Sequence, residues 1–288
     1  MLKQLIQSVL YRKHLNRTTC DGCAISQKVL MTQYKLLYHS GSNALKLNDV
    51  GFRIYSQHEE DGILLFIFSI VGTTNKQCVE ICSGDGIECN TANLILNHRW
   101  IGILFDGNQD NTRKAQQFYS SQPDSRYWPP TIVQHWITRH NINSLIDTHG
   151  FQGEIDLLSL DVDGVDYWIW KDLTVVSPRV VVLEFNHLWG PEKSVTVPYS
   201  DEFVGGFTSY GSDYAGASLN AFIKLGRAKG YRFVGTNAIA TNAFFVRQDI
   251  ACVWLPEAQS SECFNHPRAR FGMRERLRGV QNKEWVEV

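Results

Sequence analysis

The sequence predicts an α/β fold: a doubly wound, mostly parallel sheet that ends in an antiparallel hairpin and follows an N-terminal helical extension. Short apolar runs alternate with helical stretches through the middle of the chain, the pattern of strands covered by helices on both faces. Two later apolar runs are joined by a short turn, so they must pair antiparallel. With 288 residues, 43% of them hydrophobic, the chain can bury such a core without disulfides or a metal.

The elements are expected in the following order. Residues 1–50 show helical periodicity in places and are interpreted as a helical cap, beginning with the amphipathic segment MLKQLIQSVLYRKHL. A helix is predicted over 59–70, with Ser56 as its N-cap and Glu59 three residues later in a capping-box pattern. Strands are predicted at 77–81, 100–105, 131–137, 155–160 and 180–185, with helices at 91–97, 112–120 and 141–148. A helix over 216–229 then leads into the hairpin at 231–235 and 242–246.

Three segments follow from this pattern: a helical extension (1–50), a central domain (51–250) and a basic tail (251–288). The formal net charge is -1, so the molecule as a whole is not expected to bind nucleic acid or an acidic membrane. The tail is the local exception, and we interpret it as a solvated segment or a helix with charged faces, with a phosphate-binding patch as the alternative. Its arginines are Arg268, Arg270, Arg274, Arg276 and Arg278.

Cysteine content and hydropathy bear on the compartment. The seven cysteines are not spaced as a secreted disulfide framework, and Cys20-x-x-Cys23 is not followed by a second pair at zinc-ligand spacing. No apolar run is long enough to span a bilayer. We therefore expect a soluble, cytoplasmic protein that can be monomeric or oligomeric.

Small and acidic residues follow the strands where open parallel sheets bind ligands, at their carboxyl ends. The first strand contains Glu80 and runs into the loop Cys82-Ser83-Gly84-Asp85-Gly86. Asp106 ends the second strand, about 26 residues later, roughly the spacing at which a carboxylate accepts hydrogen bonds from a ribose diol. Cys82 replaces the first Gly of the phosphate-binding fingerprint, and Glu80 and Asp85 would repel a pyrophosphate. The pattern therefore favours a nucleoside without phosphates.

Over about residues 50–250 this combination resembles the class I S-adenosylmethionine-dependent methyltransferases. The stretches "YSQHEEDGILLFIF", "EIDLLSLDVDGVDYWIW", "YAGASLNAFIKLGRAKGYRFVG" and "NAFFVR" look like the FkbM-like methyltransferases, often O-methyltransferases of sugars and other natural-product hydroxyls. The resemblance implies S-adenosylmethionine as cofactor. Around its methionine part would lie Glu80, Cys82, Ser83, Gly84 and Gly86, with Asp106 at the ribose, Ser56, Gln57 and Asp61 over the amino-acid end, and Asp161 nearby.

More modest roles remain open for several of these residues. Glu80 and Gly84 also fit an ordinary strand-to-helix turn, and Ser56 and Asp61 also fit simple helix capping. Cys82 departs from the Gly usual in the family, which bears on how tightly the loop can turn.

Methyl transfer to a hydroxyl requires that the acceptor be positioned and its proton removed. His187 is the first candidate base, because its unperturbed pKa lies near neutral; Asp161 and Asp163, after the fourth strand, are further catalytic candidates. Asp161, Glu184 and Asn186 also resemble the Mg²⁺ ligands of some methyltransferases of this class. The alternative is that Asp161 and Asp163 bond backbone amides while Glu184 bonds the substrate.

The expected methyl acceptor is a small molecule or glycan. The loop over 189–214 is the expected lid above it, and six aromatic residues are expected near the same strand ends: Trp168, Trp170, Trp189, Tyr199, Tyr210 and Tyr214.

Two other functions stay open. "LSLDVDG" resembles the Asp-x-Asp signature of metal-dependent glycosyltransferases, with Asp161 and Asp163 as ligands. A catalytically inactive, methyltransferase-like binding module is the other.

Overall fold

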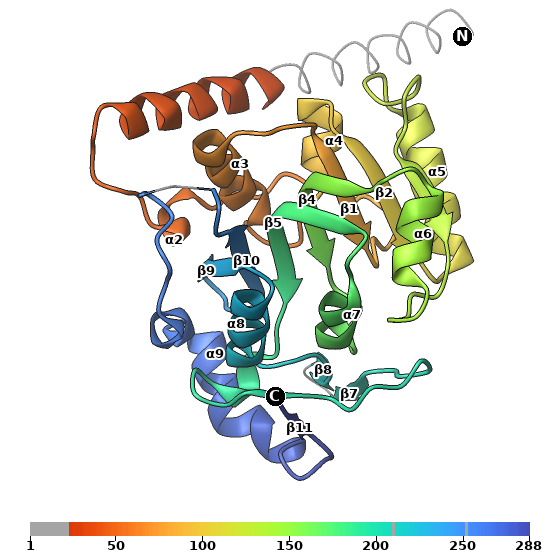
Figure 1. Ribbon diagram of the computed structural model, residues 1–288, viewed down its shortest axis with the longest axis vertical. Coiled ribbons are helices and arrows are strands. Elements are labelled where there is room, and N and C mark those ends of the chain that lie inside the picture. Colours follow the sequence, from red (N-terminus) through yellow and green to blue (C-terminus); the bar gives the residue numbers. More distant parts are fainter. Residues whose placement is uncertain (1–22, 209–210, 251–252) are drawn as a thin grey trace, which may run out of the picture.

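The computed structural model describes residues 23–208, 211–250 and 253–288. The amphipathic segment at the start of the chain, Cys20 and Tyr210 lie outside these residues. The first described helix covers residues 23–39 and lies against the rest of the molecule through buried Gln27 and Tyr34 (Figure 1). Among the described helices, none is both long and apolar enough to cross a membrane.

A seven-stranded sheet forms the centre of the molecule (Figure 1). Its order is β3-β2-β1-β4-β5-β10-β9, and β10 runs antiparallel to both of its neighbours. The chain order reverses between β1 and β4, the point at which open α/β sheets bind ligands. The sheet confirms the predicted fold class. The strands are β1 (Gln77–Ile81), β2 (Ile101–Asp106), β3 (Thr131–Gln134), β4 (Gly153–Leu160), β5 (Val176–Glu184), β9 (Tyr231–Thr236) and β10 (Asn242–Arg247).

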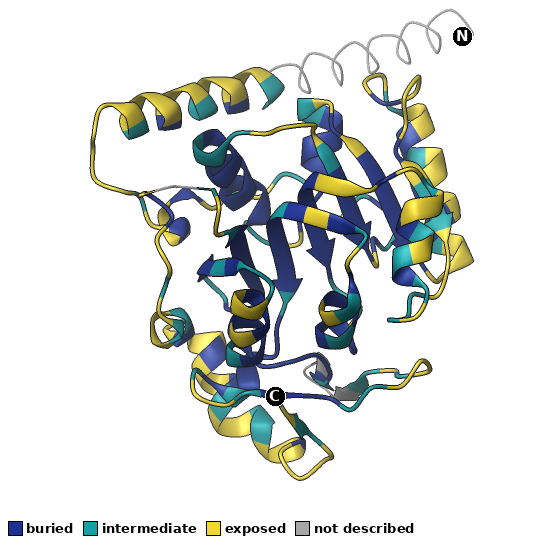
Figure 2. Ribbon diagram, viewed as in Figure 1, coloured by how far each residue is buried: buried dark blue, intermediate teal, exposed yellow. Residues whose placement is uncertain are grey.

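Helices cover both faces of the sheet because alternate strand residues point to opposite sides. Val79 and Ile81 face one apolar cluster, and Cys78 faces the other; the strands are almost wholly buried (Figure 2). On the first face pack α6 (Ile142–Thr148), α7 (Asp166–Asp172) and α8 (Leu219–Ala228). On the second pack α2 (Leu47–Val50), α3 (Glu60–Val71), α4 (Ala92–His98) and part of α5 (Gln109–Ser121).

The start of α3 differs from the capping box predicted for it. The helix begins at Glu60, and its N-cap residue Glu59 makes no side-chain cap. Ser56 Oγ instead accepts a hydrogen bond from the Asp61 amide, at 3.1 Å, while Glu59 bonds the backbone amide of Ala238 in the β9–β10 turn. The long loop before α3 therefore folds onto the carboxyl edge of the sheet, and the capping-box prediction was wrong.

The C-terminal segment is folded onto the same edge. Phe264, Ala269 and Val280 are buried, and β11 pairs with β6, so the expectation of a solvated tail was wrong. The elements that complete this end are η1 (His187–Trp189), β6 (Val195–Thr196), β7 (Gly206–Thr208), β8 (Gly211–Tyr214), η2 (Ser260–Phe264), α9 (Pro267–Phe271), η3 (Gly272–Arg276), η4 (Leu277–Gly279) and β11 (Val286–Glu287).

Candidate functional site

The loop after β1 is a tight turn with three residues in the left-handed region. Cys82 has φ +66°, Gly84 +57° and Gly86 +72°. A Cβ at Gly86 would lie 2.9 Å from the Cβ of Ala115, so this position needs glycine. Cys82 adopts the conformation that glycine takes most readily, and the loop is as tight as the glycine-containing pattern requires. Cys82 is exposed as a residue, but partial burial of its thiol raises the pKa of that group, and the carboxylates of Asp106 and Asp161 raise it further.

Asp106, at the end of β2, is tied to this loop. Its Oδ2 accepts a hydrogen bond from the Gly84 amide at 2.9 Å, and its Oδ1 accepts from Asn108 N at 2.8 Å and Asn111 Nδ2 at 3.2 Å. The side chain is almost fully buried. The structure thus brings together the loop and the carboxylate that the sequence singled out.

Glu80 lies behind the loop. Its Oε1 accepts from Ser159 Oγ on β4 at 2.8 Å, and its Oε2 from the Thr91 amide at the start of α4 at 2.9 Å. Burial raises the pKa of Glu80 to about 7, against the lowering effect of these hydrogen bonds. In this position Glu80 braces the loop between β4 and α4, with both oxygens engaged.

The segment before α3 contributes a second carboxylate to this edge. Asp61 Oδ2 accepts from the backbone amides of Ile54 at 2.7 Å, Tyr55 at 2.6 Å and Ser56 at 2.8 Å. Its Oδ1 is buried without a hydrogen-bond partner, and burial raises its pKa. Gln57, by contrast, is exposed and makes no hydrogen bond with the described residues.

Neighbouring contacts place this segment beside the strand ends. Glu60 Oε1 accepts from Asn242 Nδ2 at 2.8 Å, and Asn242 pairs with Glu184 across β10 and β5. Ser83 Oγ, in the β1 loop, is a second buried side-chain atom without a hydrogen-bond partner among the described residues. Buried polar groups are normally bonded, so the orphaned Ser83 and Asp61 oxygens are the positions where a ligand would complete the structure.

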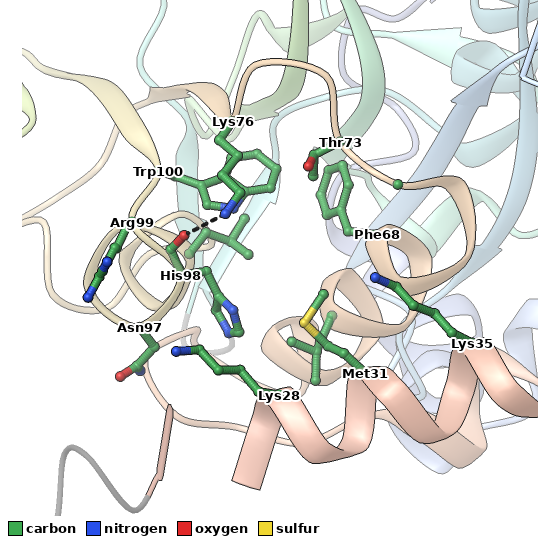
Figure 3. A pocket seen from close by; sticks show the side chains of 13 residues that line it. Lys28, Met31, Lys35, Phe68, Thr73, Lys76, Asn97, His98, Arg99 and Trp100 are labelled. Carbon is green, nitrogen blue, oxygen red and sulfur yellow. Dashed lines mark hydrogen bonds between the residues drawn. The ribbon is translucent and has the colours of Figure 1, made fainter. Parts of the chain in front are cut away.

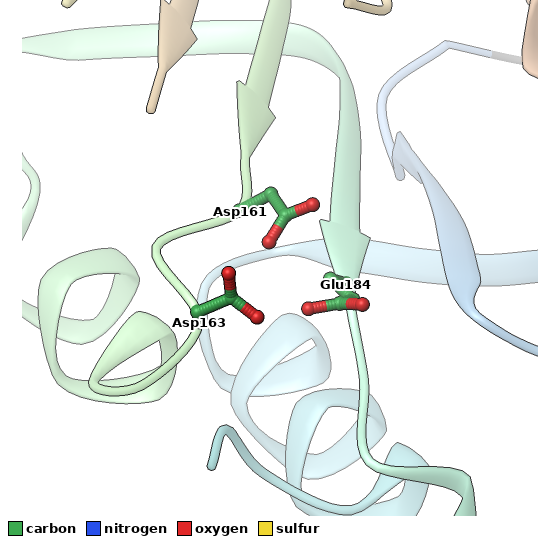
Figure 4. Close-up of side chains that lie close together, drawn as sticks. All are labelled: Asp161, Asp163 and Glu184. Carbon is green, nitrogen blue, oxygen red and sulfur yellow. The ribbon is translucent and has the colours of Figure 1, made fainter. Parts of the chain in front are cut away.

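Three carboxylates converge beyond β4 and β5 (Figure 4). Asp161, Asp163 and Glu184 each place an oxygen within 4.8 Å of the others. Burial, followed by neighbouring carboxylates, raises the pKa of Asp161 to about 7 and that of Glu184 well above its usual range; the two side chains share a hydrogen bond. Asp163, at φ +52°, is the exposed member.

Asp166 shapes the turn that carries these acids. Its Oδ1 accepts from Val162 N at 2.8 Å and its Oδ2 from Gly164 N at 3.1 Å. The hydrogen bonds to backbone amides that Asp161 and Asp163 were alternatively expected to make are therefore made here by Asp166.

Asn186 and His187 line the same cavity as Asp163 and Glu184, and hydrogen bonds within the fold engage the Asn186 amide. The Asn186 Nδ2 donates to the carbonyls of Asp213 and Ala215, both at 3.0 Å, and its Oδ1 accepts from Leu188 N. Its amide is thus used within the fold, and Asp163 takes its place in the acidic group. His187 Nε2 is buried without a partner, so close to Gly272 that a Cβ there would lie 2.6 Å away.

Two cavities open at this edge. One, of about 60 Å³, lies between Cys82 and Gly107 on one side and Phe203 on the other, with Trp136 and Val165 in its wall. The other, of about 110 Å³, is lined by Asp163, Glu184, Asn186, His187, Asp213, Arg268 and Arg276, among others. Trp136 was overlooked because the third strand was predicted to run to residue 137, whereas β3 ends at Gln134. The arginines were overlooked because the tail was expected in solvent.

The aromatic residues predicted near the strand ends divide between core and edge. Trp170 is fully buried against Phe245 and α8, so its expected place at the site was wrong. Trp168 donates to Val197 O and Tyr214 to Glu284 O, on the segments around the acceptor side. Tyr199 packs against Trp168, and Trp189 against Trp285.

A larger cavity, about 390 Å³, lies at the opposite edge of the sheet, between the helix over 23–39 and the starts of β1 and β2 (Figure 3). Lys28, Lys35 and Lys76 line it, and none of its lining residues is acidic. His98 also lines it, but its Nε2 is engaged with Gln27 Oε1 at 2.8 Å, and burial lowers its pKa to about 4.

Comparisons with known proteins point to one group of solved structures. No family model and no curated protein matches the chain. The N-terminal domain of EvdMO1 with bound S-adenosylhomocysteine is 12% identical, covers 76% of this chain and 94% of its own, and has a TM-score of 0.44. A methyltransferase from Clostridium acetobutylicum is 10% identical, covers 76% of this chain and 98% of its own, and has a TM-score of 0.42. Magnesium protoporphyrin IX methyltransferase from Synechocystis is 13% identical, covers 59% of this chain and 69% of its own, and has a TM-score of 0.36. Such values do not assign a reaction to this chain.

Proposed function

We propose that the protein is an S-adenosylmethionine-dependent methyltransferase of the FkbM-like kind that methylates a hydroxyl of a sugar, glycan or other small molecule. The observation that carries the proposal is the Gly84–Asp106 hydrogen bond, which joins a left-handed loop after β1 to a carboxylate after β2, where the strand order reverses. A carboxylate there can accept hydrogen bonds from a ribose diol.

The charge at this edge favours a cationic nucleoside over a dinucleotide. The carboxylates of Asp106, Asp161 and Asp163 all act on the Cys82 thiol, so they surround the loop. A pyrophosphate would be repelled there, whereas a sulfonium would be attracted. The unpartnered oxygens of Ser83 and Asp61 are suited to accept hydrogen bonds from the amino group of a bound amino acid.

S-adenosylmethionine supplies an electrophilic methyl group when bound. The chain must then hold the acceptor in line and take its proton. We assign the role of general base, which takes the proton of the acceptor hydroxyl, to Asp163. This residue is exposed and lines the 110 Å³ cavity together with Glu184. Asp161 and Glu184 share a proton beside it and orient the acceptor hydroxyl. His187 is less suited as the base, because its free nitrogen faces Gly272.

Mg²⁺ bound by Asp161, Asp163 and Glu184 is a second candidate for activating the hydroxyl, favoured by the convergence of three hard oxygen ligands within 4.8 Å. The two arrangements differ in one observable. With Asp163 as base, methyl transfer persists in EDTA. With the metal, it stops and is restored by added Mg²⁺.

Titration calorimetry with S-adenosylhomocysteine tests the cofactor. We expect micromolar binding by the wild-type protein and a loss of at least about tenfold in Asp106→Ala and in Ser83→Ala, because each removes polar contacts at a buried site. Asp110→Ala is the matched control, since Asp110 is exposed and pairs only with Arg113 on α5. Folded wild-type protein that binds no S-adenosylhomocysteine would sink the proposal. Binding of a nucleotide sugar with Mn²⁺, lost in Asp161→Ala, would favour the glycosyltransferase alternative instead.

A further inference from the structure

The 110 Å³ cavity is lined by acidic and basic side chains together. Asp163, Glu184 and Asp213 are its acids, and Arg268 and Arg276, from the C-terminal segment, are its cations. These arginines come from α9 and η3, and η3 packs against η1 beside the strand ends. The tail thus adds positive charge to an otherwise acidic edge.

Arg276 is held in place within this cavity. Its guanidinium forms a salt bridge with Asp213, and the two side chains are only 8% and 2% exposed. A buried ion pair of this kind keeps a guanidinium in one orientation. Because Asp213 compensates the charge of Arg276, the pair itself is close to neutral.

Arg268 is different, because its guanidinium makes no hydrogen bond or ion pair with any described residue. Arg268 is exposed overall and lines the same cavity as Arg276. Burial of part of the side chain, and then Arg276, lower its pKa, while Glu184 raises it. Both also act on His187, whose pKa falls to about 4 through burial and then through Arg268 and Arg276. An unpaired, partly desolvated cation beside a second guanidinium is an arrangement that an oxyanion would stabilise.

We propose that the methyl acceptor carries an oxyanion group, a carboxylate, phosphate or sulfate, which binds between Arg268 and Arg276 while its hydroxyl faces Asp163 and Glu184. The inference rests on the proposed function and names the substrate class: a hydroxylated acid or an acidic sugar, rather than a neutral sugar. Arg268 would act as a specificity residue, since a planar guanidinium can bond two oxygens of such a group.

Calorimetry with sodium acetate, phosphate and sulfate tests directly whether Arg268 and Arg276 bind an oxyanion. Sodium chloride at equal ionic strength controls for screening. We expect the wild-type protein to bind at least one of the three oxyanions and Arg268→Ala to bind it at least about tenfold more weakly, the loss of one charge-assisted bidentate contact. Which ion binds most tightly identifies the group on the acceptor.

Arg270→Ala is the matched control, because Arg270 lies on the same short helix, is exposed and bonds only Asn265. It should bind the ions as the wild type does. A second comparison uses glucuronate and glucose, which share hydroxyls and differ in a carboxylate. We expect glucuronate to bind more tightly than glucose, and Arg268→Ala to remove the difference.

No ion binding by the folded protein, or equal losses in the Arg268 and Arg270 variants, would overturn the inference. Titration of S-adenosylhomocysteine into the same proteins separates this outcome from failure of the proposed function. Arg268→Ala should leave that binding unchanged, because Arg268 lies on the acceptor side. Oxyanion binding without S-adenosylhomocysteine binding would overturn the methyltransferase proposal and leave the anion site in place.

Discussion

At the scale of single residues, the carboxyl edge holds several acids whose pKa is raised by burial. Burial raises the pKa of Glu80 and of Asp161 to about 7 and that of Asp166 to about 6. Each then retains its proton in the folded state at a pH where the unfolded chain has lost it. Such groups reduce stability as the pH rises, so they are kept for a purpose other than stability.

Glu80 allows a direct test of this cost. Between its ordinary pKa of 4.5 and the folded value of about 7, the unfolded chain releases the proton that the folded protein keeps. The contribution of Glu80 to the free energy of unfolding therefore falls as the pH rises through this window and is fully lost above pH 7. Glu80→Gln, which cannot ionise, should gain stability relative to the wild type by on the order of 2 to 3 kcal/mol between pH 5 and pH 8.

Urea denaturation of both proteins at the two pH values measures this difference. Glu88→Gln is the control, because Glu88 is exposed and pairs with Arg53 at 2.9 Å at the surface; its difference from the wild type should change by no more than about 0.5 kcal/mol. An equal change in both variants would show that burial of Glu80 is not the cause.

Cys82 tests whether the loop tolerates the departure from glycine. Its φ of +66° is strained for any residue with a Cβ, and most for a β-branched one. Cys82→Gly relieves this strain but adds freedom to the unfolded chain, so stability should change by less than about 1 kcal/mol. Cys82→Val should be destabilising by about 1 to 2 kcal/mol and should weaken S-adenosylhomocysteine binding. Calorimetric melting and ligand titration of both variants decide this, and equal behaviour of the two would show that the backbone there is not strained.

At the scale of elements, the sequence was sufficient for the strands and for the residues at their carboxyl ends. The apolar runs placed β1, β4 and β10 within a few residues of their observed bounds, because buried strands must be apolar on both faces. Strand ends then brought Gly84 next to Asp106 and Asp161 next to Glu184, since parallel strands end at one edge.

The short elements that cover the carboxyl edge of the sheet could not be predicted in this way. β6 and β11 have two residues each, too few for a periodicity, and they pair across about 90 residues of sequence. The sequence around Arg276 predicts a surface residue, because nothing in it shows that Asp213 lies beside the guanidinium and is buried with it. Asn242 was overlooked for a related reason: β10 is antiparallel, so its start and not its end lies at the site.

One covering element has to move if the proposed cofactor binds. The cavity next to Cys82 and Gly107 has about 60 Å³, whereas nucleoside-sized ligands occupy pockets of roughly 300 Å³ or more. Phe203 closes it by packing on Gly164, and the segment is tied down by the Trp136 Nε1 hydrogen bond to Asp201 O at 2.7 Å. The residues around Phe203, part of the lid expected at 189–214, are therefore the ones to open.

Hydrogen exchange measures this movement. We expect amides of residues 200–205 to exchange quickly without ligand and at least about tenfold more slowly with saturating S-adenosylhomocysteine, as the segment closes over it. Trp136→Phe, which removes the hydrogen bond to Asp201, should speed exchange in the free protein. Unchanged exchange in this segment on binding would show that the ligand enters elsewhere. The amides of β1 and β4 should be protected in both states and serve as the internal reference.

At the scale of the whole molecule, the two edges of the sheet have separate tasks. Three features of the carboxyl edge lower stability. They are buried oxygens without a partner among the described residues, the left-handed backbone conformation of Cys82, and acids whose pKa is raised by burial. The amino edge holds a buried carboxylate with both oxygens hydrogen-bonded. There Asp156, completely buried, accepts from the amides of Thr74 at 2.9 Å and Lys76 at 2.6 Å and pairs with Arg179 at 3.1 Å. This interaction fixes the entry into β1 and joins it to β4 and β5.

The separation predicts opposite effects of changes at the two edges. Asp156→Ala should be destabilising by about 3 kcal/mol or more, because it removes a buried acceptor of three backbone amides and leaves the charge of Arg179 without its carboxylate. It should nevertheless leave S-adenosylhomocysteine affinity within about twofold at a temperature where the variant is folded, since the loop at Gly84 lies at the far ends of the same strands. Asp106→Ala should do the reverse, with a small loss of stability and a large loss of affinity. Denaturation and titration of the same two samples measure both quantities. If Asp156→Ala weakened binding as much as Asp106→Ala, the edges would be coupled through β1, and the carboxyl edge could not be treated as an independent site.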